Sequence, residues 1–195
     1  MRVSVNAQLT HVGIFVRDLA KMIGFYQSLL GLVLTDSGPY RQTERIAFLS
    51  RSPQEHHQLV LATGRPVQEH FCVVNQLSFR VDDLEQLRAM DARLGRLGIA
   101  TERTVSHGNA WSIYLLDPEG NKVEIYVPSA WYVPQPFGHA VDLRRPASEL
   151  IVDNDAMVGR CEGVLTRAEW SRRLAERIQR HDAEADTGAV RAPAA

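Results

Sequence analysis

The sequence is short of several features that identify large classes of protein. Only two of its 195 residues are cysteines, Cys72 and Cys161, which have neither the spacing of zinc ligands nor the density of a disulfide scaffold. A net charge of −1 gives no electrostatic case for binding nucleic acid or an anionic membrane. No apolar run approaches the ~20 residues of a membrane span, and the N-terminus lacks the sections of a signal peptide. We therefore expect a cytoplasmic protein with two ordinary thiols that binds neither nucleic acid nor a membrane.

An internal repeat organises the first two thirds of the chain, whose composition is that of ordinary globular domains. The stretch "HVGIFVRDL" (11–19) aligns with "QLSFRVDDL" (76–84) at a constant shift of 65 residues. The matched pairs are Val16 and Val81, Asp18 and Asp83, Leu19 and Leu84, and, before the last strand of each half, Pro53 and Pro118. A repeat unit of this size cannot cover its own sheet, so the two copies are expected to pack together.

Each half predicts one strand, one helix and three further strands. The helices are expected over Leu19–Leu30 and Leu84–Leu97, each after an aspartate N-cap and each ending at a glycine. The later strands are predicted at Leu32–Thr35, Arg45–Leu49 and Gln58–Ala62, and at Thr101–Thr104, Trp111–Leu116 and Lys122–Val127. The predicted fold is α+β, with two paired βαβββ modules (8–65 and 74–130) whose sheets curve around a shared cavity.

The repeat ends after Pro128. Residues 131–182 form a C-terminal extension, irregular at first because of its prolines, with one helix that starts at the capping box of Thr166 and Glu169 and continues to about Arg180. The small and polar tail, 183–195, is expected to be disordered. Exposed strand edges and the aromatic-rich segment 131–137 favour a homo-oligomer, most simply a dimer.

One glutamate is unusual for its position. In "VSHGNAWSIYLLDPEGNKVEIYVP" (105–128), two runs of β-forming residues flank a turn, and Glu124 lies between Val123 and Ile125 on the second run. A buried carboxylate is costly unless it is paired or coordinates a metal. The sequence therefore predicts a partner for Glu124.

The repeat indicates where that partner lies. His11 opens the first strand of module one, and Gln76 has the matching position in module two. Matched positions meet near the axis of a pseudo-two-fold pair, so His11, Gln76 and Glu124 are expected to converge in one cavity. His57 precedes Leu59, the counterpart of Glu124, by two residues and is expected to point into the same cavity.

These features resemble the vicinal oxygen chelate superfamily, which includes glyoxalase I, methylmalonyl-CoA epimerase, fosfomycin-resistance proteins and type I extradiol (catechol-cleaving) dioxygenases. The spacing of His107, Tyr114, the turn Asp117-Pro118-x-Gly120 and Glu124 resembles the extradiol signature throughout. The stretch "EHHQLVLA" (55–62) is also similar to the strand that carries the acid–base histidine of those enzymes.

The resemblance implies a metal site of the two-histidine, one-carboxylate type, with iron(II) as the first choice and manganese, nickel, zinc or cobalt as other divalent ions. His11 and Glu124 match ligands of that site. Gln76 stands where the second histidine is expected, so it is either an amide ligand or a cavity-lining amide. Leu59 cannot supply the fourth protein ligand that the superfamily's isomerases usually have, which favours an open, three-ligand site.

The resemblance also implies catalytic roles. His57 matches the histidine that accepts the catechol proton, whereas His107 and Tyr114 match residues that hydrogen-bond the bound catecholate. His56, on the opposite face of its strand, is expected to be solvated.

Three functions follow from these implications. The first is an iron(II)-dependent extradiol dioxygenase of aromatic-compound catabolism, which cleaves a catechol-like substrate with O2. The second is a glyoxalase-type, metal-dependent isomerase or lyase. The third is a metal-free binding protein for small aromatic molecules, and the metal content of protein purified without oxygen distinguishes the three.

Overall fold

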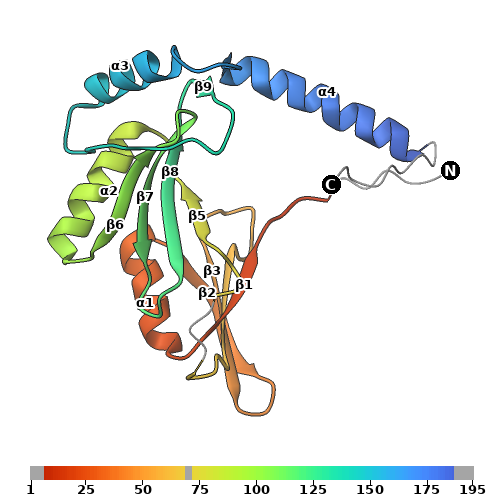
Figure 1. Cartoon of the computed structure of the whole chain (residues 1–195). Helices are drawn as coiled ribbons and strands as arrows, with labels where there is room; N and C mark the ends of the chain where they lie inside the picture. The colour runs from red at the N-terminus through yellow and green to blue at the C-terminus, as the bar shows by residue number, and fades with distance from the viewer. Residues whose placement is uncertain (1–6, 69–71, 187–195) are drawn as a thin grey trace. The chain divides into compact units, whose positions relative to one another are not determined.

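The computed structural model describes residues 7–68 and 72–186 and contains the predicted repeat (Figure 1). The first module consists of β1 (Val12–Val16), α1 (Leu19–Leu30), β2 (Val33–Tyr40), β3 (Glu44–Ser50) and β4 (Leu59–Thr63). The second consists of β5 (Leu77–Arg80), α2 (Leu84–Leu97), β6 (Thr101–Ser106), β7 (Ala110–Leu116) and β8 (Lys122–Pro128). The predicted α+β fold with two βαβββ modules is therefore confirmed.

The strand order is the same in both modules. The first sheet runs β1-β4-β3-β2, and the second runs β5-β8-β7-β6, with the short strand β10 (His139–Ala140) added next to β6. In the first sheet β1 is parallel to β4, with Val12 opposite Leu59, and the other pairs are antiparallel. In each module the first and last strands are therefore neighbours, although the helix and two strands separate them in sequence.

Both predicted helices have the predicted bounds because local capping determines them. The side chains of Asp18 and Asp83 each accept a hydrogen bond from a backbone N–H three residues later, at 3.0 and 2.8 Å. Gly31 and Gly98 both end their helices with a φ of +66°, a left-handed conformation that favours glycine. The faces buried by the two helices consist of Met22, Tyr26 and Leu29 in α1 and of Leu84, Leu87 and Leu94 in α2.

The chain divides into two compact units that cut across the repeat. The first unit contains Gln8–Phe79 and Tyr114–Glu124, and the second contains Arg80–Ile113 and the described residues from Ile125 onward. Five of the predicted site residues belong to the first unit: His11, His57, Gln76, Tyr114 and Glu124. His107 belongs to the second unit.

The C-terminal extension contains two helices, so the prediction of a single helix was wrong. The helix that the sequence analysis missed is α3 (Ala147–Val158), which begins after Pro146 without a side-chain cap. Its buried positions are Leu150, Asn154 and Val158, and the central asparagine interrupts the apolar pattern that would identify a helix. Two short strands, β9 (Trp131–Tyr132) and β11 (Leu165–Thr166), pair before the last helix begins.

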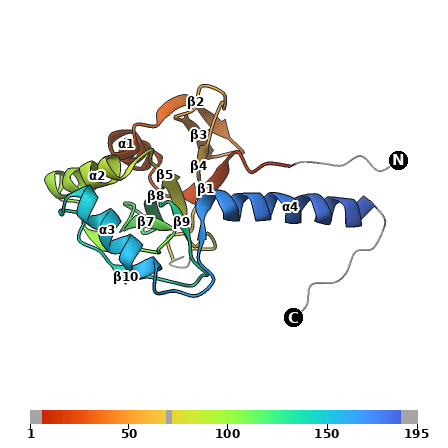
Figure 2. The same ribbon diagram turned by 90° about the horizontal axis from the view of Figure 1, so that it is seen from above.

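That last helix, α4 (Arg167–Asp186), has the predicted cap, because the Thr166 hydroxyl accepts a hydrogen bond from the Glu169 N–H at 3.1 Å. Figure 2 shows it as one long helix that begins beside β9, where the rings of Tyr132 and Trp170 stack with centroids 5.5 Å apart. The helix extends beyond the predicted end at Arg180, so residues 183–186 are helical, contrary to the prediction of disorder. The rest of the predicted tail, 187–195, lies outside the described residues.

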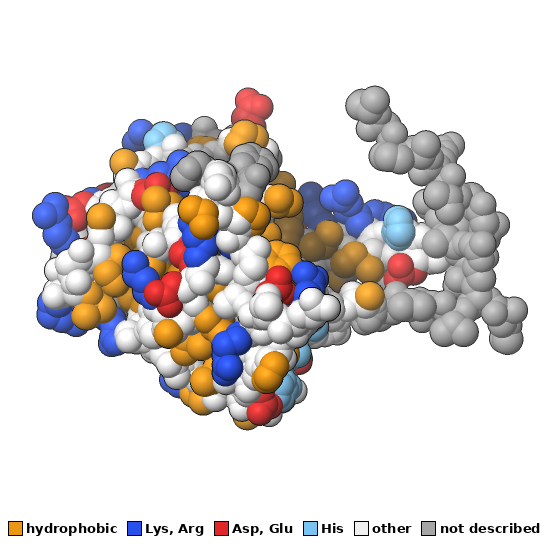
Figure 3. Space-filling model, turned by 90° about the horizontal axis from the view of Figure 1, so that it is seen from below, with side chains coloured by type: hydrophobic (Ala, Val, Ile, Leu, Met, Phe, Trp, Pro, Cys, Tyr) orange, Lys and Arg blue, Asp and Glu red, His pale blue; other side chains and the backbone are white. Residues whose placement is uncertain are grey.

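Charges of both signs are interspersed over the face shown in Figure 3, as expected from the small net charge. None of the helices within the described ranges combines the length and the apolar character needed to cross a membrane.

Candidate functional site

Three side chains donate hydrogen bonds to the buried carboxylate of Glu124. The Oε2 atom accepts from Gln76 Nε2 at 2.7 Å and from Ser78 Oγ at 2.6 Å. The Oε1 atom accepts from Tyr114 Oη at 2.7 Å. Glu124 is 8% exposed and its neighbours Val123 and Ile125 are fully buried, so this charge depends on hydrogen bonds that replace water.

The strand order brings these donors together. Strand β8, which carries Glu124, lies between β7 and β5. Tyr114 lies in β7. Ser78 lies in β5, and Gln76 is the residue directly before the start of β5. The carboxylate is therefore held from both neighbouring strands, as the sheet of the repeat requires.

Ser78 belongs to this cluster, although the sequence analysis did not identify it. It lies two residues after Gln76 on an extended segment, and residues two apart share a face of a strand. Its hydroxyl also accepts a hydrogen bond from Gln76 Nε2 at 2.9 Å. The two-residue alternation of side chains along a strand, counted from Gln76, would have identified Ser78 as a residue on the same face.

His11 and His57 form a second set of contacts in the first unit. Their ring centroids are 4.4 Å apart, with the planes tilted by 60°. His11 directly precedes β1 and His57 precedes β4 by two residues, and the parallel pairing of these strands brings their starts to the same edge. The strand predicted at Gln58–Ala62 is observed as β4 at Leu59–Thr63, so His57 lies in the segment just before it.

The surroundings of His57 favour its uncharged form. Burial lowers the pKa of its imidazole from the ordinary value of 6.5, and the nearby rings of His11 and His56 lower it further. An uncharged imidazole at neutral pH can accept a proton.

His56 has protein partners, although the sequence analysis expected it to be only solvated. Its Nε2 lies 2.7 Å from Asp36 Oδ2, and its Nδ1 lies 2.9 Å from His57 Nδ1. Because a carboxylate can only accept, Nε2 of His56 carries a hydrogen. Asp36, His56 and His57 thus form a continuous hydrogen-bonded chain. Asp36 comes from β2, so the alternation of side chains along the segment that carries His56 could not predict this contact.

His107 begins the tight turn between β6 and β7 in the second unit. Its backbone N–H donates to the Ala110 carbonyl at 2.8 Å, and its Nδ1 lies 2.8 Å from the Phe137 carbonyl oxygen. A carbonyl oxygen can only accept, so Nδ1 carries the hydrogen and, in the neutral ring, Nε2 is the acceptor nitrogen.

The predicted metal ligands stay a prediction. Within residues 7–68 and 72–186, no group of three or more histidine, cysteine, aspartate or glutamate side chains is arranged to hold a metal ion. The predicted set has only two such side chains, His11 and Glu124, because its third member is the amide of Gln76. The structure brings Gln76 and Tyr114 to Glu124, and it brings His57 to His11.

Comparison with known proteins identifies the family of the repeat. The family model described as the Glyoxalase/Bleomycin resistance protein/Dioxygenase superfamily matches residues 8–125, which is more than half of the chain. No curated protein matches the chain.

Solved structures share the fold. A glyoxylase/bleomycin resistance protein/dioxygenase domain from Frankia sp. EAN1pec is 22% identical with a TM-score of 0.56, covering 64% of this chain and 100% of that one. The fosfomycin resistance protein FosX from Listeria monocytogenes, complexed with Mn(II) and sulfate, is 19% identical with a TM-score of 0.51, covering 64% and 95%. The trypanothione-dependent glyoxalase I of Leishmania major is 20% identical with a TM-score of 0.51, covering 62% and 86%. At these identities the likeness concerns the fold.

Proposed function

The chain belongs to the glyoxalase/bleomycin resistance protein/dioxygenase superfamily, and on this premise we propose that it is an iron(II)-dependent dioxygenase of the extradiol type. Its substrate would be a catechol-like aromatic diol, cleaved with O2. The observation that supports this most is the contact of Gln76 and Tyr114 with the buried carboxylate of Glu124. Tyr114 and Glu124 belong to the extradiol-like pattern, and Gln76, from a distant part of the sequence, stands where the resemblance implies the second histidine.

The donor chemistry of the predicted ligands fits a divalent metal. Imidazole, carboxylate and amide oxygen are all ligands of iron(II) or of other divalent ions, and His11, Glu124 and Gln76 would hold the ion. The Gln76 amide lies 2.7 Å from the Glu124 carboxylate, so both side chains can reach one ion when the amide is turned to present its oxygen. When bound, iron(II) supplies open coordination positions for the diol and for O2.

The other site residues would orient the carboxylate and move protons. The hydroxyls of Ser78 and Tyr114 fix the direction of the Glu124 carboxylate from two sides. His57, uncharged because of its lowered pKa, would accept the proton that a diol hydroxyl loses on binding. For His107, the resemblance implies a hydrogen bond to a diol oxygen.

Two alternatives have specific support. Glu124 already has three protein donors, which a metal-free binding protein for small aromatic molecules would need. Glyoxalase I shares this fold, which supports an isomerase or lyase, and FosX, which also shares it, was solved with Mn(II), which supports metal dependence.

Metal analysis of protein purified without oxygen separates the three functions. Iron in the wild type, together with oxygen uptake on addition of simple catechols, is the result expected for the extradiol dioxygenase. Manganese, nickel, zinc or cobalt without oxygen uptake would replace it with the isomerase or lyase. A metal-free chain that binds catechol would replace it with the binding protein.

Two variants connect the result to the site. Glu124→Ala removes the only anionic ligand and is expected to abolish both metal content and oxygen uptake. Glu44→Ala, which removes a glutamate of the same unit whose carboxylate pairs with Arg41, is the matched control and should retain both. Metal retained in Glu124→Ala would contradict the proposed ligand set.

A further inference from the structure

The turn that carries His107 is held by residues from outside the repeat. The carbonyl of Gly108 accepts hydrogen bonds from Ser129 Oγ at 2.6 Å and from Asn154 Nδ2 at 3.0 Å. The carbonyl of His107 accepts from Gln135 Nε2 at 2.9 Å. Three separate points of the C-terminal part, one of them on α3, thus converge on two consecutive residues.

Asn154 also holds the residue before the turn. Its Oδ1 accepts from Ser106 Oγ at 2.7 Å, and Ser106 Oγ in turn accepts from the Gly108 N–H at 3.2 Å. Asn154 is 2% exposed and Ser106 is 5% exposed. The buried amide therefore uses both its donor and its acceptor on this turn, and its loss would leave buried polar groups unpaired.

The packing around Gly108 shows how closely the extension contacts the turn. Gly108 has a φ of +71°, and a Cβ built there would lie 2.7 Å from Val133 Cγ2 and 3.3 Å from Phe137 Cε1. Only glycine satisfies both the backbone conformation and the available space. The turn is therefore fixed against the extension rather than flexible.

We propose that Ser129 and the C-terminal extension form a positioning clamp for His107, to which the extension contributes Gln135, Phe137 and Asn154. The three side chains fix the backbone of the turn, and the Phe137 carbonyl fixes the ring in the tautomer that carries its hydrogen on Nδ1. All four residues lie beyond the segment 8–125 that matches the family model. The clamp deepens the proposed function. It rests on that function for the role of His107 toward substrate.

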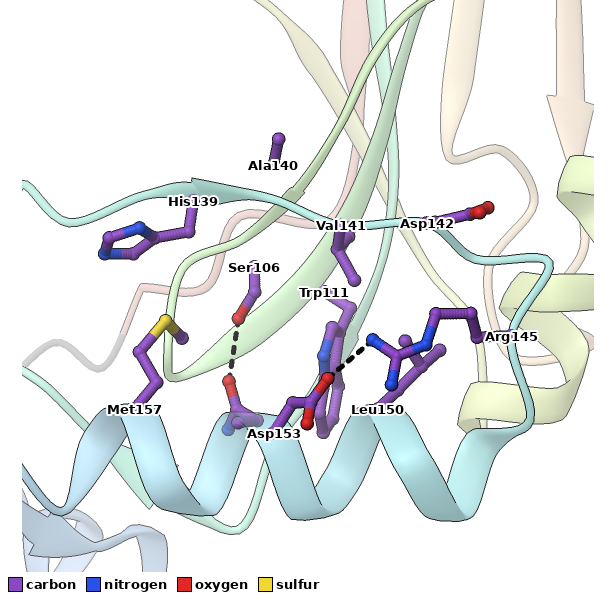
Figure 4. A pocket seen from close by; sticks show the side chains of 11 residues that line it. Ser106, Trp111, His139, Ala140, Val141, Asp142, Arg145, Leu150, Asp153 and Met157 are labelled. Carbon is purple, nitrogen blue, oxygen red and sulfur yellow. Dashed lines mark hydrogen bonds and ion pairs between the residues drawn. The ribbon is translucent and has the colours of Figure 1, made fainter.

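A small cavity beside the clamp offers a matched control. It has a volume of about 120 Å³, and Figure 4 shows the bond from Ser106 to α3 and the pair of Arg145 and Asp153 among its lining residues. Asp153 precedes Asn154 on the same helix, but its partner is Arg145, with which it forms an exposed ion pair. Asp153→Asn therefore changes the same cavity wall without changing the clamp.

The test is a long-range ¹H–¹⁵N correlation spectrum of the imidazoles in the metal-free protein, with His107 assigned from a His107→Gln variant. The wild type is expected to show His107 as a single Nδ1–H tautomer. Asn154→Asp keeps the acceptor for Ser106 but loses the donor to Gly108, and it should give a mixture of tautomers for His107. Asp153→Asn should give the wild-type spectrum.

Steady-state kinetics provide the second measurement. Displacing a group that contacts substrate by about 1 Å can cost about 10²-fold in rate, so kcat of Asn154→Asp is expected to fall between about 10- and 100-fold at unchanged metal content. A Nε2–H tautomer in the wild type, or an unchanged His107 spectrum in folded Asn154→Asp, would overturn the clamp.

Ser129→Ala gives an independent measurement should Asn154→Asp fail to fold, because it removes a single donor to Gly108. A mixture of His107 tautomers in Ser129→Ala supports the clamp, and the wild-type spectrum contradicts it. The spectra require neither metal nor substrate. A wild type with the expected tautomer that takes up no oxygen with catechols would thus contradict the proposed function and not the clamp.

Discussion

Replacing Tyr114 by phenylalanine tests whether the Glu124 cluster is held as described. The substitution keeps the buried ring and removes the hydroxyl that donates to Glu124 Oε1 at 2.7 Å. Tyr114 is 4% exposed and Glu124 8% exposed, so water cannot easily replace the lost donor. The loss of stability should therefore lie within the range for a buried hydrogen bond to a charged group rather than within the range for a solvent-exposed hydrogen bond.

The magnitude follows from the remaining contacts. A hydrogen bond to a charged group contributes about 1.5–3 kcal/mol, and Glu124 keeps the donors Gln76 and Ser78, so the carboxylate is not left unpaired. We expect Tyr114→Phe to lower the free energy of unfolding by about 2 kcal/mol. For a chain of this length, that corresponds to a fall in Tm of about 4–8 °C.

The assay is urea unfolding of chelator-treated protein, followed by circular dichroism, with stability compared at equal m-value. The control is Tyr40→Phe, a half-buried tyrosine in the same unit whose ring contact with the Arg41 guanidinium a phenylalanine retains. A loss in Tyr114→Phe no larger than in Tyr40→Phe would refute the view that this hydroxyl stabilises a buried carboxylate.

Three further predictions concern the proton acceptor, the metal and a buried tyrosine. His57→Ala should slow turnover by about 10²–10⁴-fold because it removes the proton acceptor. Steady-state oxygen uptake on a substrate that the wild type cleaves measures this rate, and equal rates in the variant and the wild type would exclude the role. Gln76→His should tighten iron(II) binding in anaerobic titration because imidazole suits iron better than an amide oxygen does, and unchanged affinity would place the ligand elsewhere. Burial and then the Asp117 carboxylate raise the pKa of Tyr26 far above its ordinary value of 10.0. Above pH 10 the unfolded chain loses the Tyr26 proton while the folded chain keeps it, so the stability of the wild type should fall there. The stability of Tyr26→Phe should depend less on pH. Equal pH dependence of the two proteins in urea unfolding would contradict this.

The sequence by itself determined the repeat and the helices within it. The alignment of 11–19 with 76–84 predicted two copies of one unit, and aspartate caps with terminal glycines gave the exact bounds of both helices. Capping and periodicity are local properties, set by residues within one or two turns of each other, so they can be read without knowledge of the fold. The buried glutamate was found in the same way, because an acidic residue in the middle of a strand pattern needs a partner wherever the strand lies.

The tertiary structure decided which partners those residues have. Ser78 reaches Glu124 because β5 lies next to β8, and Asp36 reaches His56 from another strand. Helix α3 and its contact with the His107 turn were missed, because an asparagine stands at the buried position where a helix pattern calls for an apolar residue. That asparagine is buried only because its amide bonds the turn, some 46 residues earlier in the chain. Hydrogen bonds between distant segments depend on strand order and packing, and a single sequence specifies these only through the folded chain as a whole.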